Sequence, residues 1–152
     1  MQRLRVLETT DPAGHVHRNT YDAAGRLSAT TNPRSHTWSY GYERLASSVT
    51  DPLNRTTRTE VNGYGQMTRM VFADATTSTV SYLGSSSLDE AGELPVLVVD
   101  EAGREREFGY TNLELTSATD SAGSTWTYSF SGLTATVVSP EGRTRTIVSD
   151  EA

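Results

Sequence analysis

The sequence predicts an all-β chain of tandem β-hairpins that pair into one open antiparallel sheet. Short clusters typical of reverse turns recur along the 152 residues. Between them the side chains alternate with a period of two, as strands require, and no stretch sustains the 3.6-residue period of an amphipathic helix. Hydrophobic residues make up only 35% of the chain. We therefore expect strands with at least one solvent-exposed face and a small hydrophobic core.

The turns are predicted by four-residue clusters that begin with Asp, Asn or Ser and end with Gly or Asn. The first side chain can accept hydrogen bonds from the backbone just ahead, and the last residue tolerates the positive φ that closes a three-residue hairpin with a bulge. We call the first residue of each cluster the head of the turn. Asn32–Ser35 and Asp74–Thr77 have such a head but lack the closing glycine, so we expect looser turns there. The regular clusters are Asp11–Gly14, Asp22–Gly25, Asp51–Asn54, Asn62–Gly65, Asp89–Gly92, Asp100–Gly103, Asp120–Gly123 and Ser139–Gly142.

A longer repeat lies over the short one. Residues 32–56 align without a gap on residues 120–144, which places Trp38 on Trp126 and Tyr40 on Tyr128. The interpretation is a single array over residues 1–152, in units of about forty residues, because self-similarity at a fixed period is typical of repeat architectures. The units span approximately 11–50, 51–99 and 100–138, with a partial unit at 139–152 and an insertion in residues 84–95.

Two strands carry aromatic residues on one face and small polar residues on the other. Flat aromatic rows suit the faces of sugar rings, and they also supply the largest apolar area for packing in a chain poor in Leu and Ile. Both interpretations stay open, with packing favoured. The candidate carbohydrate-binding or partner-binding residues are Trp38, Tyr40 and Tyr42 in one row and Trp126, Tyr128 and Phe130 in the other.

Charge and composition argue against several classes of function. The formal charge is −6, and the thirteen basic residues are all Arg and scattered, so we expect strand-surface ion pairs and no nucleic-acid partner. The chain has no cysteine, which excludes disulfides, thiol catalysis and Cys-based zinc sites. No apolar run approaches the ~20 residues of a membrane-spanning helix. Residues 1–7 have charge but no apolar signal segment, so we expect any export to be directed from outside this chain.

Metal and catalytic sites are not predicted. Each Asp-x-x-Gly cluster offers one or two carboxylates, whereas calcium prefers six to eight oxygen ligands. His15 and His17 lie two residues apart without an evident third ligand, and His36 sits beside a turn. No Gly-x-Ser-x-Gly motif occurs. We therefore expect no enzyme activity, no catalytic residue, no metal and no cofactor.

Residues Tyr21–Ser28 resemble the core of the Rhs/YD-repeat family, Tyr-Asp-x-x-Gly-Arg-Leu followed by small polar residues. Asp11–Gly14 and the stretch from Asp100 to Tyr110 resemble the companion half-repeat, so the likeness covers nearly all of residues 10–150. Val61 and Asn62 replace the Tyr-Asp pair in one unit, and Tyr110 keeps only the tyrosine in another.

The resemblance implies a spiralling sheet of hairpins that forms part of a hollow shell, as in bacterial polymorphic toxins, insecticidal toxin complexes and teneurins. It implies a structural, non-catalytic segment that encloses or displays a toxin or effector, within a secreted or cell-surface parent. The implied partners are neighbouring repeats of a longer chain, other copies paired at strand edges, and an enclosed toxin. The Asp-Pro-x-Gly-Leu stretch of self-cleaving members has no full match here, because His15 stands where Leu is required. The competing hypothesis is a cell-surface adhesion or carbohydrate-binding module that uses the aromatic rows.

Overall fold

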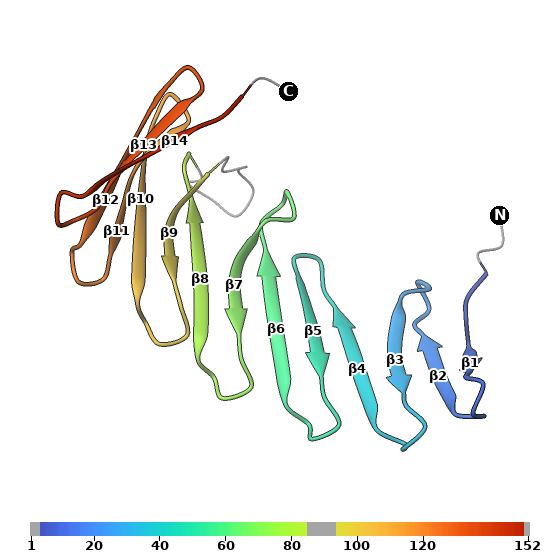
Figure 1. Ribbon diagram of the computed structural model, residues 1–152. Helices are drawn as coiled ribbons and strands as arrows, with labels where there is room; N and C mark the ends of the chain where they lie inside the picture. The colour runs from blue at the N-terminus through green and yellow to red at the C-terminus, as the bar shows by residue number, and fades with distance from the viewer. Residues whose placement is uncertain (1–3, 85–93, 151–152) are drawn as a thin grey trace. The chain divides into compact units, whose positions relative to one another are not determined.

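The computed structural model describes residues 4–84 and 94–150, and these form fourteen β-strands and no helix. The strands are hydrogen-bonded in the order in which they occur in the chain (Figure 1). Neighbours pair antiparallel, for example β4 with β5 and β12 with β13. The prediction of an open all-β sheet of tandem hairpins is confirmed. The strands are β1 (Glu8–Thr10), β2 (Val16–Tyr21), β3 (Leu27–Thr31), β4 (Thr37–Tyr42), β5 (Ala46–Thr50), β6 (Thr56–Val61), β7 (Met67–Val71), β8 (Thr77–Tyr82), β9 (Pro95–Val99), β10 (Glu105–Thr111), β11 (Glu114–Asp120), β12 (Thr125–Ser131), β13 (Thr134–Val138) and β14 (Thr144–Val148).

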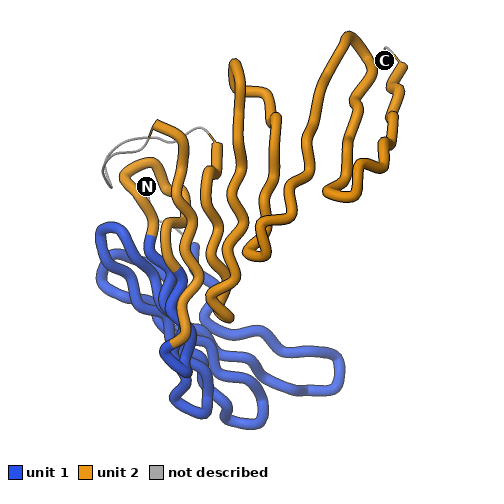
Figure 2. The backbone as a smooth tube through the Cα atoms, turned by 90° about the vertical axis from the view of Figure 1, so that its left-hand side faces the viewer, with its two compact units in different colours: residues 1–60, 70–75 blue, residues 61–69, 76–152 orange. Residues whose placement is uncertain are grey.

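The chain divides into two compact units, coloured separately in Figure 2. Unit 1 comprises residues 1–60 and 70–75, and unit 2 comprises residues 61–69 and 76–152. Each unit is a run of hairpins in which a strand contacts the strands before and after it in sequence. Packing is therefore local in both units.

Seven of the eight regular clusters form the predicted turns, and the eighth, Asp89–Gly92, lies outside the described residues. In each of the seven, the head N–H donates to the carbonyl four residues ahead, and the fourth residue donates to the head carbonyl. Gly103 closes one such turn with φ of 73°, and Asn54 closes another with φ of 60°. Local turn chemistry therefore determines where most hairpins reverse.

The two irregular clusters depart from prediction in different ways. Asn32–Ser35 is not looser, because Ser35 adopts φ of 63° and makes the same closing bond as a glycine. The expected Asp74–Thr77 turn is wrong in register. The turn runs Phe72–Ala75, closed by the Ala75 N–H on the Phe72 carbonyl, with Ala75 at φ of 67°. The bond that closes the turn joins two backbone groups, so Phe72 can stand at the first position although its side chain cannot accept hydrogen bonds.

Three hairpins close without such a cluster and were not predicted. Asn112 and Leu113 both have positive φ, at 52° and 68°, which is the two-residue type I′ loop that suits twisted strands. Gly132, at φ of 56°, lies in the loop between β12 and β13. Between β4 and β5 the Glu43 N–H donates to the Ala46 carbonyl.

The sheet has two unlike faces and almost no enclosed interior. Among the described residues only Ala46, Ala118 and Asn62 are buried. The accessible surface is 10863 Å² for a chain of 16.5 kDa, whereas a compact domain of that mass exposes roughly 7,600 Å². Much of the side-chain area that a globular protein would cover is therefore open to contact.

Candidate functional site

The first aromatic row lies on β4, where Trp38 and Tyr40 are half-buried and Tyr42 is exposed. Tyr40 stands opposite Val49 of β5, so the two side chains share a face of the sheet. The Arg26 guanidinium lies 4.6 Å from the centre of the Tyr42 ring, within the range of a cation–π interaction. These rings pack against their own sheet, which supports the packing interpretation for this row.

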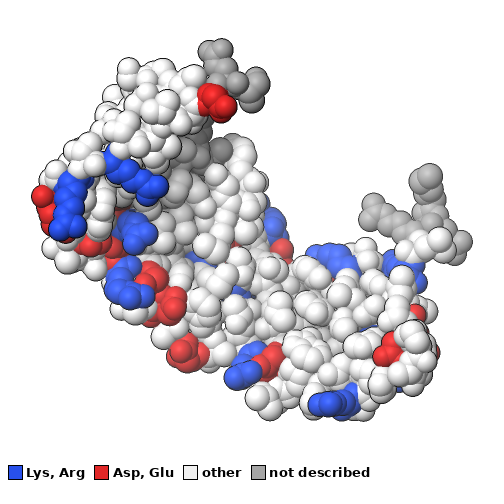
Figure 3. Space-filling model, in the orientation of Figure 1, with Lys and Arg blue, Asp and Glu red and all other residues white. Residues whose placement is uncertain are grey.

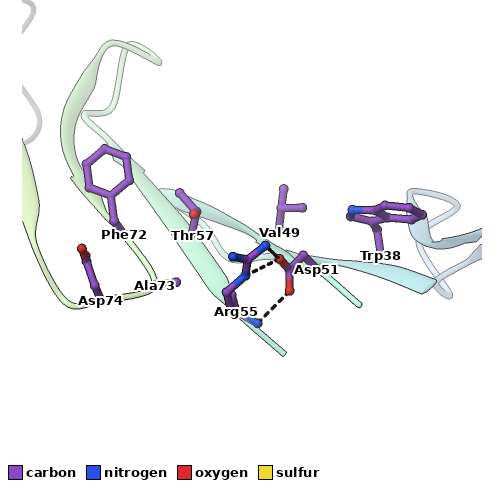
Figure 4. Close-up of a pocket in the computed structure, with 8 residues that line it drawn as sticks. All are labelled: Trp38, Val49, Asp51, Arg55, Thr57, Phe72, Ala73 and Asp74. Atoms are coloured by element: carbon purple, nitrogen blue, oxygen red, sulfur yellow. Dashed lines mark hydrogen bonds and ion pairs between the residues drawn. The ribbon is translucent and has the colours of Figure 1, made fainter. Parts of the chain in front are cut away.

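Beside this row unit 1 has an open hollow of about 600 Å³ (Figure 4). Trp38, Val49 and Thr57 line one part of it, and Phe72 lines another. Arg55 completes an ion pair with Asp51 within it: Nη2 lies 2.5 Å and Nε 2.7 Å from Asp51 Oδ2. The Arg55 guanidinium holds the pKa of the Asp51 carboxyl below its usual value. The charged groups of this pair are already engaged with each other.

The second aromatic row lies on β12, where Trp126 and Tyr128 are half-buried and Phe130 is exposed. Tyr128 stands opposite Val137, and Trp126 stands opposite Ala118 of β11. This row belongs to unit 2 and the first row to unit 1. Each row therefore has neighbours within its own unit that sequence reasoning did not name.

Those neighbours form a smaller hollow of about 210 Å³. Arg106 and Phe108 of β10 line it together with Ala118, Thr119, Trp126 and Tyr128. Phe108 stands opposite Ala118 on the other side from Trp126. No sequence motif marks this group, because its members come together only through the register of three strands.

Three tyrosines form a repeated contact that sequence analysis also missed. The hydroxyls of Tyr21, Tyr82 and Tyr110 donate to the backbone carbonyls of Val6, Met67 and Pro95, each at 2.9 Å and each fifteen residues earlier. Burial raises the pKa of Tyr110. We call this contact the tyrosine clasp, and it gives the tyrosine of the Tyr-Asp pair a structural role.

The acidic turn heads hold their hairpins with both carboxylate oxygens. In the Asp100 turn, Oδ1 accepts the backbone N–H groups of Ala102 and Arg104, and Oδ2 accepts Arg104 Nε at 2.7 Å. Asp22–Arg26 and Asp51–Arg55 repeat this arrangement. The hydrogen bond from the Arg104 backbone is the main cause that lowers the pKa of Asp100, and the Arg26 backbone does the same for Asp22.

The prediction that arginines form strand-surface ion pairs is confirmed only in part. Arg18 pairs with Glu8 across two strands, and Arg58 pairs with Glu43 and Glu60. The three arginines of the turn heads pair within their turns. In Figure 3 charges of both signs are interspersed on the visible face, with no large patch of either.

His15 and His17 do not lie on the same strand. His15 is the fifth residue of the first turn, and its Nδ1 lies 2.9 Å from Asp11 Oδ2, while His17 lies on β2. His36 occupies the same position in the Asn32 turn and donates its backbone N–H to Asn32. No cluster of three metal-ligating side chains occurs within residues 4–84 and 94–150.

The comparison with protein families bears on these turns and clasps. The family model described as RHS Repeat matches residues 3–37 and again residues 21–56. Residues 3–56 are therefore similar to RHS repeats. No curated protein matches the chain. The matched residues include the Tyr21 clasp and the Asp22 and Asp51 turns. Both the tyrosine clasp and the Asp–Arg turn therefore occur within the residues that match the family model.

The tyrosine clasp and the Asp–Arg turn also occur outside the matched residues. Tyr82 and Tyr110 make the same clasp as Tyr21, and Asp100 forms the same Asp–Arg turn as Asp22 and Asp51. None of the described residues forms a helix long and apolar enough to cross a membrane.

Proposed function

We propose that the chain is a structural segment of an RHS-repeat shell or scaffold that encloses or displays a toxin or effector and performs no catalysis itself. The observation that carries the proposal is the pairing of hairpins in sequence order around almost no core. Such a chain gains its stability from contacts between neighbouring repeats. Repeats of this kind are therefore suited to form a continuous sheet, to which further repeats can be added along the chain.

The two faces of the sheet support a wall with different sides. On β12 the aromatic residues point to one face, and Thr127 and Ser129 point to the other, where they stand opposite Val138 and Thr136. A shell has an inner and an outer side, and a sheet with one aromatic and one polar face can present a different surface to each. We further propose that residues 1–152 form one array, with units near 11–50, 51–99, 100–138 and 139–152.

The partners proposed for this segment are neighbouring repeats or other copies, paired at the strand edges. β14 pairs only with β13 among the described strands, and all five of its residues are exposed. An unpaired edge presents backbone donors and acceptors to another strand. We therefore expect the isolated chain to form dimers or larger assemblies as its concentration rises.

Proline substitution at two adjacent positions of β14 tests edge pairing. Ser149 donates to the Leu133 carbonyl, so by the antiparallel alternation Ile147 donates to β13 and Thr146 points its N–H outward. Thr146→Pro should abolish concentration-dependent assembly in light scattering while the β13–β14 hairpin remains. Ile147→Pro, the matched control, should disrupt that hairpin. A wild-type chain that stays monomeric at high concentration would contradict the proposal.

A further inference from the structure

The hollow lined by Phe108 and Trp126 forms a cleft over β10, β11 and β12, which are neighbours in the sheet (Figure 1). Phe108, Ala118 and Trp126 stand directly opposite one another in that order, so all three point to the same face. Ala118 is 7% exposed and forms the floor, and the two rings are half-buried on either side. Tyr128 and Arg106 lie at the rim.

The width of the cleft restricts what fits between its walls. Phe108 and Trp126 are two strand spacings apart, which is roughly 9.5 Å. This is a separation of backbones, and it leaves the space above Ala118 open to a ring that enters between the two side chains. The C–H faces of a pyranose pack against aromatic rings.

Two charged side chains stand beside the cleft: Arg106 lines it, and Asp120 lines the neighbouring hollow together with Arg106 and Phe108. Arg106 lies opposite Asp120 on the same face, and its guanidinium makes no ion pair with any residue that the structure describes. Asp120 Oδ1 accepts the N–H groups of Ala122 and Ser124, each at 2.9 Å. Ser124 occupies the position that Arg takes in the Asp22, Asp51 and Asp100 turns. Asp120 Oδ2 therefore lacks the partner that those heads have within the described part of the chain.

We propose that this cleft binds one pyranose ring of an uncharged glycan. Phe108 and Trp126 pack on its two faces, Arg106 donates to ring hydroxyls, and Asp120 Oδ2 accepts from them. A guanidinium and a carboxylate together satisfy hydroxyl groups, which both donate and accept. The two charges cancel, which favours a neutral sugar over an acidic one. The scaffold function requires no such ligand, so this inference is independent of it.

Unit 1 contains the equivalent row with different neighbours. Trp38 stands opposite Thr30, and Thr30 stands opposite Asn19. The Thr30 hydroxyl donates to Asn19 Oδ1 at 2.9 Å. Trp38 thus has no alanine beside it and no aromatic residue in register two strands away, although its sequence context aligns with that of Trp126. Phe72, which lines the hollow of Trp38, comes from the turn after β7. Trp38 provides a matched control for a ligand that merely adheres to tryptophan.

Calorimetric titration of the 152-residue chain with cellohexaose, mannohexaose and polygalacturonate tests the proposal. We expect one of the two neutral oligosaccharides to bind at one site per chain. Trp126→Ala and Phe108→Ala should each weaken binding by about tenfold or more, as the loss of a packed aromatic wall predicts. Trp38→Ala should leave the affinity within about twofold, because Trp38 lies outside this cleft and no aromatic residue stands in register with it across an alanine.

Two further variants separate loss of binding from loss of folding. Arg106→Gln alters an exposed side chain and should weaken binding while the circular dichroism spectrum and unfolding midpoint stay at wild-type values. Ala118→Leu raises the floor and should block the ring. Equal losses in Trp38→Ala and Trp126→Ala, binding only to polygalacturonate with a steep salt dependence, or no binding to either neutral oligosaccharide would overturn the proposal. Assembly through β14 is measured separately, so the two proposals can fail independently.

Discussion

At the scale of single residues, the turn heads show how a sheet without a core satisfies its backbone. Asn62 is 1% exposed, and its Oδ1 accepts the N–H groups of Tyr64 and Gln66 while its Nδ2 donates to Gln66 Oε1 at 2.7 Å. Asn32 makes the same two backbone bonds but is only half-buried. Burial and the additional bond to Gln66 Oε1 distinguish Asn62 from Asn32.

Replacing each asparagine by alanine measures that difference. Asn62→Ala leaves buried amides without partners and should lower the free energy of unfolding by about 1–3 kcal/mol. Asn32→Ala exposes its amides to water and should cost only about 0.5–1.5 kcal/mol. Urea denaturation of both variants gives the comparison, and equal costs would show that burial of the head does not matter.

The aspartates at the turn heads make the free energy of unfolding depend on pH. Hydrogen bonds from the backbone and from arginine lower the pKa of Asp22, Asp51 and Asp100 in the folded chain. A group with a lowered folded pKa contributes stability above its unfolded value and loses it as the pH falls through the folded value. We therefore expect stability to decline from about pH 4 downward, since an unfolded aspartate titrates near ~3.9.

One substitution assigns part of this decline to a single turn. Asp100→Asn removes a titrating group and the ion pair with Arg104, so the variant should be less stable at neutral pH and lose less stability between neutral pH and pH 2. Glu101→Gln changes the charge of the next residue in the same turn and serves as the control. The measurement is the urea midpoint as a function of pH. Parallel curves for wild type and Asp100→Asn would contradict the assignment.

At the scale of strands and hairpins, the tyrosine clasp joins the end of one strand to a residue fifteen positions earlier. Tyr110→Phe removes the donor to the Pro95 carbonyl and should cost about 1–3 kcal/mol of unfolding free energy if that carbonyl is left unsatisfied. Tyr128→Phe is the control, because the Tyr128 hydroxyl makes no hydrogen bond within the described residues. Thermal unfolding of the pair decides whether the clasp stabilises the fold or follows from it.

The closing position of each turn gives a second comparison between hairpins. Ala75 adopts φ of 67°, where an L-residue is strained, so Ala75→Gly should stabilise the chain by roughly 0.5–1 kcal/mol. Gly103→Ala should destabilise it by about 1–2 kcal/mol. An added Cβ at Gly103 meets no atom within 4 Å, so the effect is conformational and not a clash. Changes of the same sign in both variants would contradict this account.

Features that depend on residues close together in the sequence were predictable, and features that depend on the register of distant strands were not. Turns such as Asp22–Gly25 were predictable because head, closing residue and hydrogen bonds lie within five positions. The Phe72–Ala75 turn was misplaced because Phe72, which begins it, is not of the predicted residue type, and Asp74 lies inside the turn. The aromatic rows were found by their alternation, but Phe108 and Arg106 were not linked to Trp126. Their proximity depends on the register of three strands, which no short motif encodes.

At the scale of the whole molecule, stability that comes from neighbouring strands should vary with a strand's position in the array. Within unit 2, β11 is hydrogen-bonded on both sides, to β10 and β12, whereas β14 pairs only with β13 among the described strands. All five residues of β14 are exposed, while most of β11 is half-buried or buried. A nearest-neighbour array opens from its less paired strands, because each opening there breaks one interface and not two.

Hydrogen exchange should reveal this gradient. At concentrations where the chain is monomeric, the amides of β14 that donate to β13, and the adjacent Ser149 amide that donates to Leu133, should exchange at least about tenfold faster than the paired amides of β11. Ile147→Pro, which removes one bond of the last interface, should accelerate exchange in β13 more than in β12, and in β12 more than in β11. Mass spectrometry of peptides from each strand measures the order. Uniform protection from β10 to β14 would mean that the unit unfolds as one cooperative body, and additive repeat energetics would then not describe it.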